Sequence, residues 1–169
     1  MKSVFLTGFM GTGKSSVGKI LSERLGCKFI DLDALIVAEA GTSIKEIFAR
    51  HGEPHFRALE AEILGRLASE MCAVVSTGGG VVIDTENRRR MRAEGLVVNL
   101  TATAQAICER LAADDERPLL QYDNSLERIK AMLAEREPFY READIRIDTT
   151  GKSVDDIVGQ ILVWLKKRS

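Results

Sequence analysis

The segment Gly8–Ser15, which reads GFMGTGKS, constrains this chain more than any other feature. It matches the pattern G-x-x-x-x-G-K-[ST], and the apolar segment Val4–Leu6 precedes it directly. Apolar residues recur at helical spacing behind it: Val17, Ile20, Leu21 and Leu25. A strand, a glycine-rich loop and a helix in this order predict a loop whose backbone amides enclose phosphate groups. The alternative, a glycine-rich turn before an ordinary helix, leaves the Lys and Ser in register unexplained.

The motif therefore predicts a nucleoside triphosphate site. Its candidate residues are Gly11, Thr12, Gly13, Lys14, Ser15 and Ser16. We expect Lys14 to reach the β- and γ-phosphates, where it acts in catalysis, and Ser15 to bind Mg²⁺.

Length and composition favour a soluble protein of one domain, residues 1–169. The net charge of −1 argues against a nucleic-acid partner, which usually requires a basic excess. The one dense basic run, Arg88–Arg92, is interpreted as the solvated face of a helix, with nucleic-acid contact as the lesser alternative.

No signal peptide and no stretch of membrane-spanning length is visible, so we expect a cytoplasmic protein without a membrane partner. The three cysteines, Cys27, Cys72 and Cys108, are far apart, and none forms a C-x-x-C pair. They are expected to be reduced thiols in or near the core.

Apolar runs alternate with helical patterns along the chain, which predicts an α/β fold with a doubly wound, parallel, five-stranded sheet flanked by helices. Strands are expected at 4–6, 28–31, 72–76, 96–100 and 143–148. The last strand alternates polar and apolar residues, as an edge strand does. The region of about 34–70 shows two or three helices with no strand between them, and we interpret it as a helical insert over the catalytic face. The charged, non-periodic segment of about 113–124 is interpreted as a lid.

Ligands of open parallel sheets gather at the carboxyl ends of the strands, and polar residues follow several strands here. Asp31 is expected to hold Mg²⁺ and Asp33 to accept a proton or hydrogen bond from a substrate hydroxyl, the alternative being an Asp pair that caps the next helix. Gly78–Gly80 suggests a close approach of backbone to ligand, the alternative being a flexible turn. Arg117 in the lid is a candidate for stabilising the transferring phosphoryl group, or else a solvated surface residue.

Together these residues resemble those of the shikimate kinase family, over essentially the whole chain. The resemblance rests on the phosphate loop and on six further elements of sequence: DLD at 31–33, G-E-x-x-F-R-x-x-E at 52–60, GGG at 78–80, RPLL at 117–120, Arg136 and Tyr140. It implies a P-loop kinase with a nucleoside monophosphate kinase-like fold. The implied reaction is MgATP-dependent phosphorylation of the 3-hydroxyl of shikimate, on the route to chorismate and the aromatic amino acids.

The resemblance also implies roles for single residues. Arg57 and Arg136 would bind the shikimate carboxylate, whereas Asp33, Gly79 and Gly80 would hold the hydroxyl side. Arg110 would border the adenine, with the loop that contains Lys152 on the other side and Arg117 closing over the phosphates. From the residues alone, Arg57 and Arg136 can equally form ion pairs on helix surfaces. The partners expected are thus ATP and a small molecule, and the chain is expected to act as a monomer.

Two other functions remain open from the residues themselves. One is another small-molecule kinase of the same fold, such as a gluconate or nucleoside monophosphate kinase. The other is a nucleotide-dependent switch or binding module. The low aromatic content, 5%, argues against recognition of a nucleobase acceptor by stacking.

Overall fold

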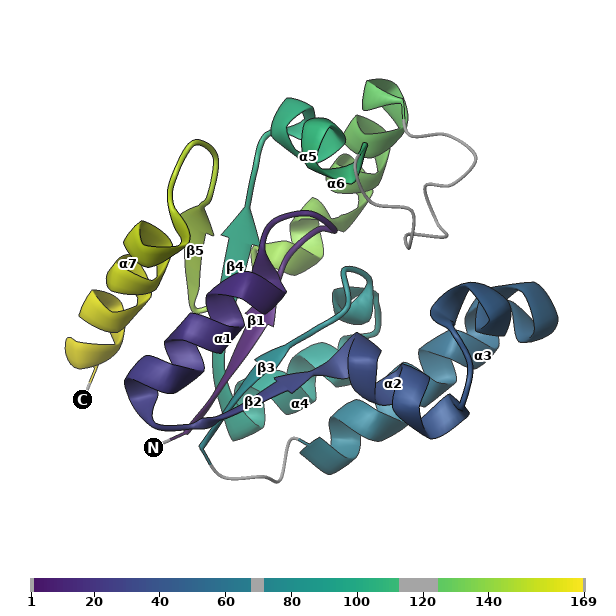
Figure 1. Cartoon of the computed structure of the whole chain (residues 1–169), viewed down its shortest axis with the longest axis horizontal. Helices are drawn as coiled ribbons and strands as arrows, with labels where there is room; N and C mark the ends of the chain where they lie inside the picture. Colours follow the sequence, from purple (N-terminus) through teal and green to yellow (C-terminus); the bar gives the residue numbers. More distant parts are fainter. Residues whose placement is uncertain (1, 68–71, 113–124, 169) are drawn as a thin grey trace.

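The computed structural model describes residues 2–67, 72–112 and 125–168, and centres on a parallel sheet (Figure 1). Its strands are β1 (Ser3–Thr7), β2 (Lys28–Asp31), β3 (Ala73–Ser76), β4 (Gly95–Thr101) and β5 (Ile145–Asp148). The helices are α1 (Lys14–Leu25), α2 (Leu32–Ala40), α3 (Ile44–Leu67), α4 (Thr85–Glu94), α5 (Ala104–Leu111), α6 (Leu126–Tyr140) and α7 (Val154–Lys166), with the short 3₁₀ helix η1 (Val81–Ile83). The Arg117 side chain and the segment of about 113–124, expected to be a lid, lie outside the described residues.

The strand order is β2-β3-β1-β4-β5, and every pairing between neighbouring strands is parallel. β1 therefore occupies the centre of the sheet, and the phosphate loop follows it directly. This confirms the predicted doubly wound, five-stranded parallel sheet for the described part of the chain. β5 lies at an edge, as its alternating pattern predicted.

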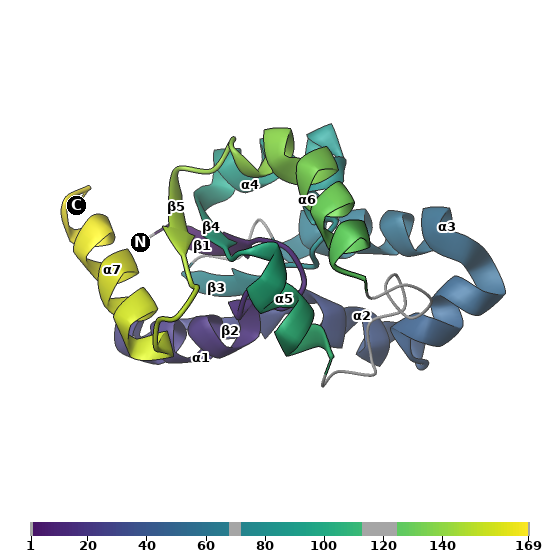
Figure 2. The same ribbon diagram turned by 90° about the horizontal axis from the view of Figure 1, so that it is seen from above.

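The side chains of β1 alternate between two hydrophobic cores, because successive residues of a strand face opposite sides of the sheet. Val4 and Leu6 belong to the core under α1 and α7, whereas Phe5 belongs to the core under α4 and α6. Figure 2 shows the sheet between these two pairs of helices. All three side chains are almost completely buried, so β1 and the loop that follows it rest on a rigid base.

The expected helical insert is formed by α2 and α3, which pack on one another and extend beyond β2 at the end of the sheet opposite α7 (Figure 1). α3 is kinked at Gly52, whose φ of 81° is left-handed and favours glycine. Pro54 follows the kink and starts the second part of the helix. Proline has no backbone N–H, and in the first turn of a helix that donor would have no partner within the helix. After the kink, Phe56 is buried. The Arg57 guanidinium lies next to Gly80, beyond the carboxyl end of β3.

Polar side chains cap the starts of α3 and α7. The Ser43 hydroxyl accepts a hydrogen bond from the Glu46 amide, and Ser153 and Asp156 form a complete capping box at the start of α7. The basic run lies on α4, where Arg89 and Arg90 pair with Glu86 on the exposed face. Within the described residues, no helix is both long enough and apolar enough to cross a membrane.

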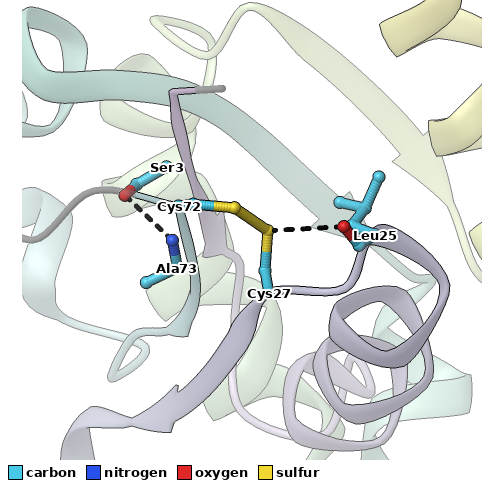
Figure 3. The surroundings of a disulfide bond; sticks show 5 residues. All are labelled: Ser3, Leu25, Cys27, Cys72 and Ala73. Atoms are coloured by element: carbon cyan, nitrogen blue, oxygen red, sulfur yellow. Dashed lines mark hydrogen bonds between the residues drawn. A yellow bond between two sulfur atoms is a disulfide. The ribbon is translucent and has the colours of Figure 1, made fainter.

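The expectation that all three cysteines are reduced is wrong for this structure, because Cys27 and Cys72 form a disulfide (Figure 3). Their wide separation along the chain suggested no pairing. However, each residue directly precedes one of two neighbouring parallel strands, and the register of β2 on β3 pairs Lys28 with Ala73. Strand pairing therefore places the two cysteines next to one another.

Candidate active site

The phosphate loop adopts backbone conformations that require glycine. Gly8, Gly11 and Gly13 all have positive φ values, and Gly13 directly precedes the first turn of α1. A Cβ atom at Gly8 would overlap the carbonyl oxygen of Leu100 in β4. The loop is thus packed closely on the sheet with the amino end of α1 behind it, which is the geometry of an anion site.

Lys14, the first residue of α1, is buried, and its ammonium group folds over the loop. Its Nζ atom donates hydrogen bonds to the carbonyl oxygens of Gly8 and Phe9, at 2.8 and 3.0 Å. Thr12 is also buried, and its hydroxyl donates to the Phe9 carbonyl, so this side chain stabilises the loop from within. The positive charge of Lys14 is therefore held at the centre of the loop.

Ser15 and Asp31 lie together, as expected for a shared magnesium site. The Ser15 hydroxyl donates to Asp31 Oδ2 at 2.6 Å. The hydroxyl oxygens of Ser15 and Ser76 lie 3.3 Å apart. Asp31 Oδ1 accepts from the Ala34 amide, so the same carboxylate also caps α2. The capping alternative is therefore correct for one oxygen of Asp31, while the other oxygen lies beside the Ser15 hydroxyl. Hydroxyl and carboxylate oxygens are ligands that Mg²⁺ prefers, usually together with waters and substrate phosphates.

A cavity of about 570 Å³ joins the phosphate loop to the ends of β2 and β3. Its lining includes Gly11, Gly13, Lys14, Ser15, Ser16, Asp31, Asp33, Ser76 and Thr77. Asp31 and Asp33 both line this cavity, from different elements. Asp31 ends β2 and Asp33 lies in the first turn of α2.

Gly78–Gly80 is the point at which the insert, the sheet and α6 meet. An added Cβ at Gly78 would lie 2.5 Å from Glu60 Oε1 and 3.1 Å from Asp33 Oδ1. At Gly80 it would overlap the Arg57 guanidinium, and at Gly79 it would lie 3.6 Å from Arg136 Nη1. The glycines therefore leave room for charged side chains to approach this segment closely.

Arg57 does not form a simple surface ion pair. Its Nη1 atom donates to Glu60 Oε2 at 2.8 Å, and the Glu60 side chain is almost completely buried. Arg57 retains 21% exposure, and its guanidinium stacks near the Phe56 ring. Burial raises the pKa of Glu60 to about 7, while the neighbouring Arg57 opposes this rise.

Arg136 comes to the same place from α6. It is buried, its guanidinium carbon lies 5.4 Å from the centre of the Phe9 ring, and its Nη1 has no hydrogen-bond partner among the described residues. Next to it, the Tyr140 hydroxyl donates to the Gly79 carbonyl at 2.6 Å. Burial raises the pKa of Tyr140 to about 12. A buried guanidinium with an unused donor favours an anionic ligand.

Arg110 of α5 connects the phosphate loop to the loop that follows β5. Its Nη1 atom donates to the Gly11 carbonyl at 2.9 Å and to the Thr149 hydroxyl at 3.2 Å. Lys152 lies in the same loop, and its amide donates to the Thr149 carbonyl. The structure therefore brings Arg110 and the loop that contains Lys152 together beside the phosphate loop.

Glu60 and Tyr140 were parts of the recognised pattern but were not predicted as site residues. The spacing of Arg57 and Glu60 gives little signal, because an arginine and a glutamate three residues apart usually form an exposed pair on a helix. Only burial distinguishes Glu60 from such a residue. Phe9, which lies beneath Arg136, occupies a variable position of the phosphate-loop pattern and has no signal of its own.

The fold and this site define a class: a P-loop phosphotransferase with a site for a small anionic molecule beside the phosphate loop. Comparison with known proteins narrows the class. The family model for shikimate kinase matches residues 10–166. The shikimate kinase of Geobacter metallireducens is 60% identical, over 99% of this chain and 94% of that one. The shikimate kinase of Geobacter sulfurreducens is 54% identical, over 98% of this chain and 92% of that one.

The solved structure of the Acinetobacter baumannii shikimate kinase in complex with shikimate superimposes with a TM-score of 0.96 at 34% identity. The match covers 100% of this chain and 95% of that one. The chain belongs to the shikimate kinase family. It is accordingly a kinase that uses ATP and acts on a small molecule.

Proposed function

We propose that this protein transfers the γ-phosphoryl group of MgATP to the 3-hydroxyl of shikimate, giving shikimate 3-phosphate and ADP. One observation carries the proposal for the acceptor site. Two guanidinium groups, from Arg57 and Arg136, meet two carboxylates, from Asp33 and Glu60, around Gly78–Gly80 and next to the phosphate-loop cavity. A small molecule with a carboxylate at one end and hydroxyls at the other matches this arrangement.

Arg57 and Arg136 bind the shikimate carboxylate, and Gly79 and Gly80 allow the ring to lie against backbone. Asp33 lies between this region and the phosphate loop, so its carboxylate accepts the hydrogen bond or the proton of the reacting hydroxyl. Lys14 supplies positive charge to the phosphates, and Ser15 with Asp31 holds Mg²⁺, which neutralises phosphate charge when bound. No covalent phosphoenzyme is required, because phosphoryl transfer depends chiefly on positioning and charge.

The nucleotide base lies against Arg110 and Lys152 in this proposal, and Arg117 closes over the phosphates on a lid of about 113–124. Lid closure expels water, which otherwise competes with shikimate as acceptor. In this proposal residues 1–169 form a single kinase domain that acts as a monomer. Its dependence on ATP supports a cytoplasmic location.

The test is an assay of ADP release with and without shikimate, with gluconate and a nucleoside monophosphate as alternative acceptors. ADP release should rise steeply on adding shikimate alone, and it should stop when EDTA removes Mg²⁺. Equal release with and without shikimate would instead support a nucleotide switch. Faster turnover of either alternative acceptor would assign the site to a different kinase reaction.

A further inference from the structure

The disulfide between Cys27 and Cys72 lies at the amino ends of β2 and β3, the edge of the sheet opposite the active site (Figure 3). The two Cα atoms are 5.5 Å apart, within the usual range for a disulfide, although the residues are 45 positions apart along the chain. β2 and β3 carry the bridge at one end and the neighbouring site residues Asp31 and Ser76 at the other. The bridge thus closes the base of the loop that contains α2 and α3.

The surroundings of the bridge suit both the oxidised and the reduced form. Both cysteines are half-buried, so neither residue is enclosed in the hydrophobic core. The Leu25 carbonyl oxygen lies 3.8 Å from Cys27 Sγ and can accept a hydrogen bond from a reduced thiol. The Ala73 amide donates to the Ser3 hydroxyl, so the start of β3 is held to β1 whether or not the bridge exists. Opening the disulfide therefore leaves the pairing of the strands in place.

We propose that Cys27 and Cys72 are a reversible thiol–disulfide site, at which oxidation stabilises the loop that contains α2 and α3. That this loop binds the acceptor rests on the proposed function. The stabilisation itself does not, because it follows from cross-linking the chain. A disulfide removes conformational freedom from the unfolded chain, and it does so more strongly when the enclosed loop is long. Because the bridge lies four strand residues away from Asp31, we expect the chemistry to be unaffected by its oxidation state.

The exchange partner is a low-molecular-weight thiol and its disulfide, of the glutathione class. In reduction, a thiolate attacks one sulfur of the bridge and releases the other cysteine as a thiolate, which takes up a proton. A second small-molecule thiolate then attacks the small-molecule sulfur of the mixed disulfide and releases the remaining cysteine as a thiolate, which also takes up a proton. Two thiols thus become one small disulfide while the protein gains two electrons and two protons, and oxidation is the reverse.

The experiment compares the protein equilibrated with oxidised glutathione and with reduced glutathione, followed by blocking with a maleimide and mass measurement. The oxidised protein should add at most one maleimide, at Cys108, which can itself form a mixed disulfide with glutathione, and the reduced protein three. Oxidation should raise the melting temperature by roughly 5–15 °C, the shift expected for a typical disulfide in a chain of this size. This comparison needs no variant and so cannot fail through misfolding.

Cys27→Ser and Cys72→Ser should melt like the reduced protein under both conditions. Cys108→Ser, the matched control on α5, should keep the full response to oxidation. Addition of three maleimides after equilibration with oxidised glutathione, or equal melting temperatures of the oxidised and reduced forms, would overturn the proposal. A several-fold change of kcat on oxidation would also overturn it, since it would show a catalytic switch. A normal thermal response in a protein that does not phosphorylate shikimate would refute only the proposed function.

Discussion

Replacing Arg57 by methionine separates the contribution of this residue to stability from its contribution to binding. Its guanidinium is the only ion-pair partner of Glu60 among the described residues, and Glu60 is almost completely buried. Methionine retains most of the side-chain volume but removes the charge. The variant therefore leaves a buried carboxyl group without its direct ion-pair partner.

Removing one partner of a buried ion pair usually costs about 3–5 kcal/mol. We expect the lower end, about 3 kcal/mol, because Arg57 is one-fifth exposed and Glu60 can take up a proton instead. In a chain of this length that corresponds to a fall in melting temperature of roughly 6–12 °C. Arg50→Met is the matched control on the same helix, since Arg50 is 67% exposed and forms only a surface pair with Glu46. It should change stability by about 0.5 kcal/mol or less.

The loss of stability in Arg57→Met should also depend on pH in a defined direction. The pKa of Glu60 is about 7 in the folded protein and near 4.5 when unfolded, so its contribution to stability is fully present below about pH 4.5 and falls as pH rises to about 7. Without Arg57 the pKa of Glu60 rises further, and the fall continues above pH 7 by about 1.4 kcal/mol per pH unit. The difference between variant and wild type should therefore be larger near pH 8 than near pH 5.5.

Urea unfolding of wild type, Arg57→Met and Arg50→Met at the two pH values measures these differences. If Arg57→Met were as stable as Arg50→Met at both pH values, the assignment of Arg57 as the counter-ion of Glu60 would be refuted. A penalty that shrinks with rising pH would show that Glu60 is not the group responsible.

Further predictions concern the acceptor and nucleotide sites. Arg136→Met should weaken shikimate binding in calorimetry by about 10–100-fold while ATP binding is retained, because a charge-assisted contact is worth about 1.5–3 kcal/mol. Arg141→Met, an exposed control at the end of the same helix, should leave shikimate affinity unchanged, and equal affinities in both variants would exclude Arg136 from the carboxylate site. Lys14→Met should abolish turnover with the circular-dichroism spectrum of the fold intact, whereas near-normal kcat would remove Lys14 from the phosphates. Asp33→Asn should lower kcat by roughly 10²-fold, the scale of general-base removal, and barely change ATP affinity. A variant that keeps most of its kcat would show that Asp33 serves only as part of the first turn of α2.

The sequence by itself determined the fold class and the place of the nucleotide site. The phosphate-loop pattern is local: its glycines, lysine and serine are adjacent, and their conformations follow from short-range steric and hydrogen-bonding rules. The alternation of strand and helix patterns similarly predicted the parallel sheet, its edge strand β5 and the insert formed by α2 and α3. Resemblance to a family supplied the functions of single residues, which spacing alone left open.

Only the tertiary structure decided which charged residues are buried and which cysteines meet. Arg57-x-x-Glu60 and the basic run on α4 look alike in sequence, yet Glu60 is completely buried whereas Glu86 and Arg89 are exposed. Cys27 and Cys72 are joined because the register of β2 on β3 places them side by side. Burial and strand register arise from contacts between segments far apart in the chain. Such contacts are fixed only when the sheet assembles, so a local sequence pattern does not show them.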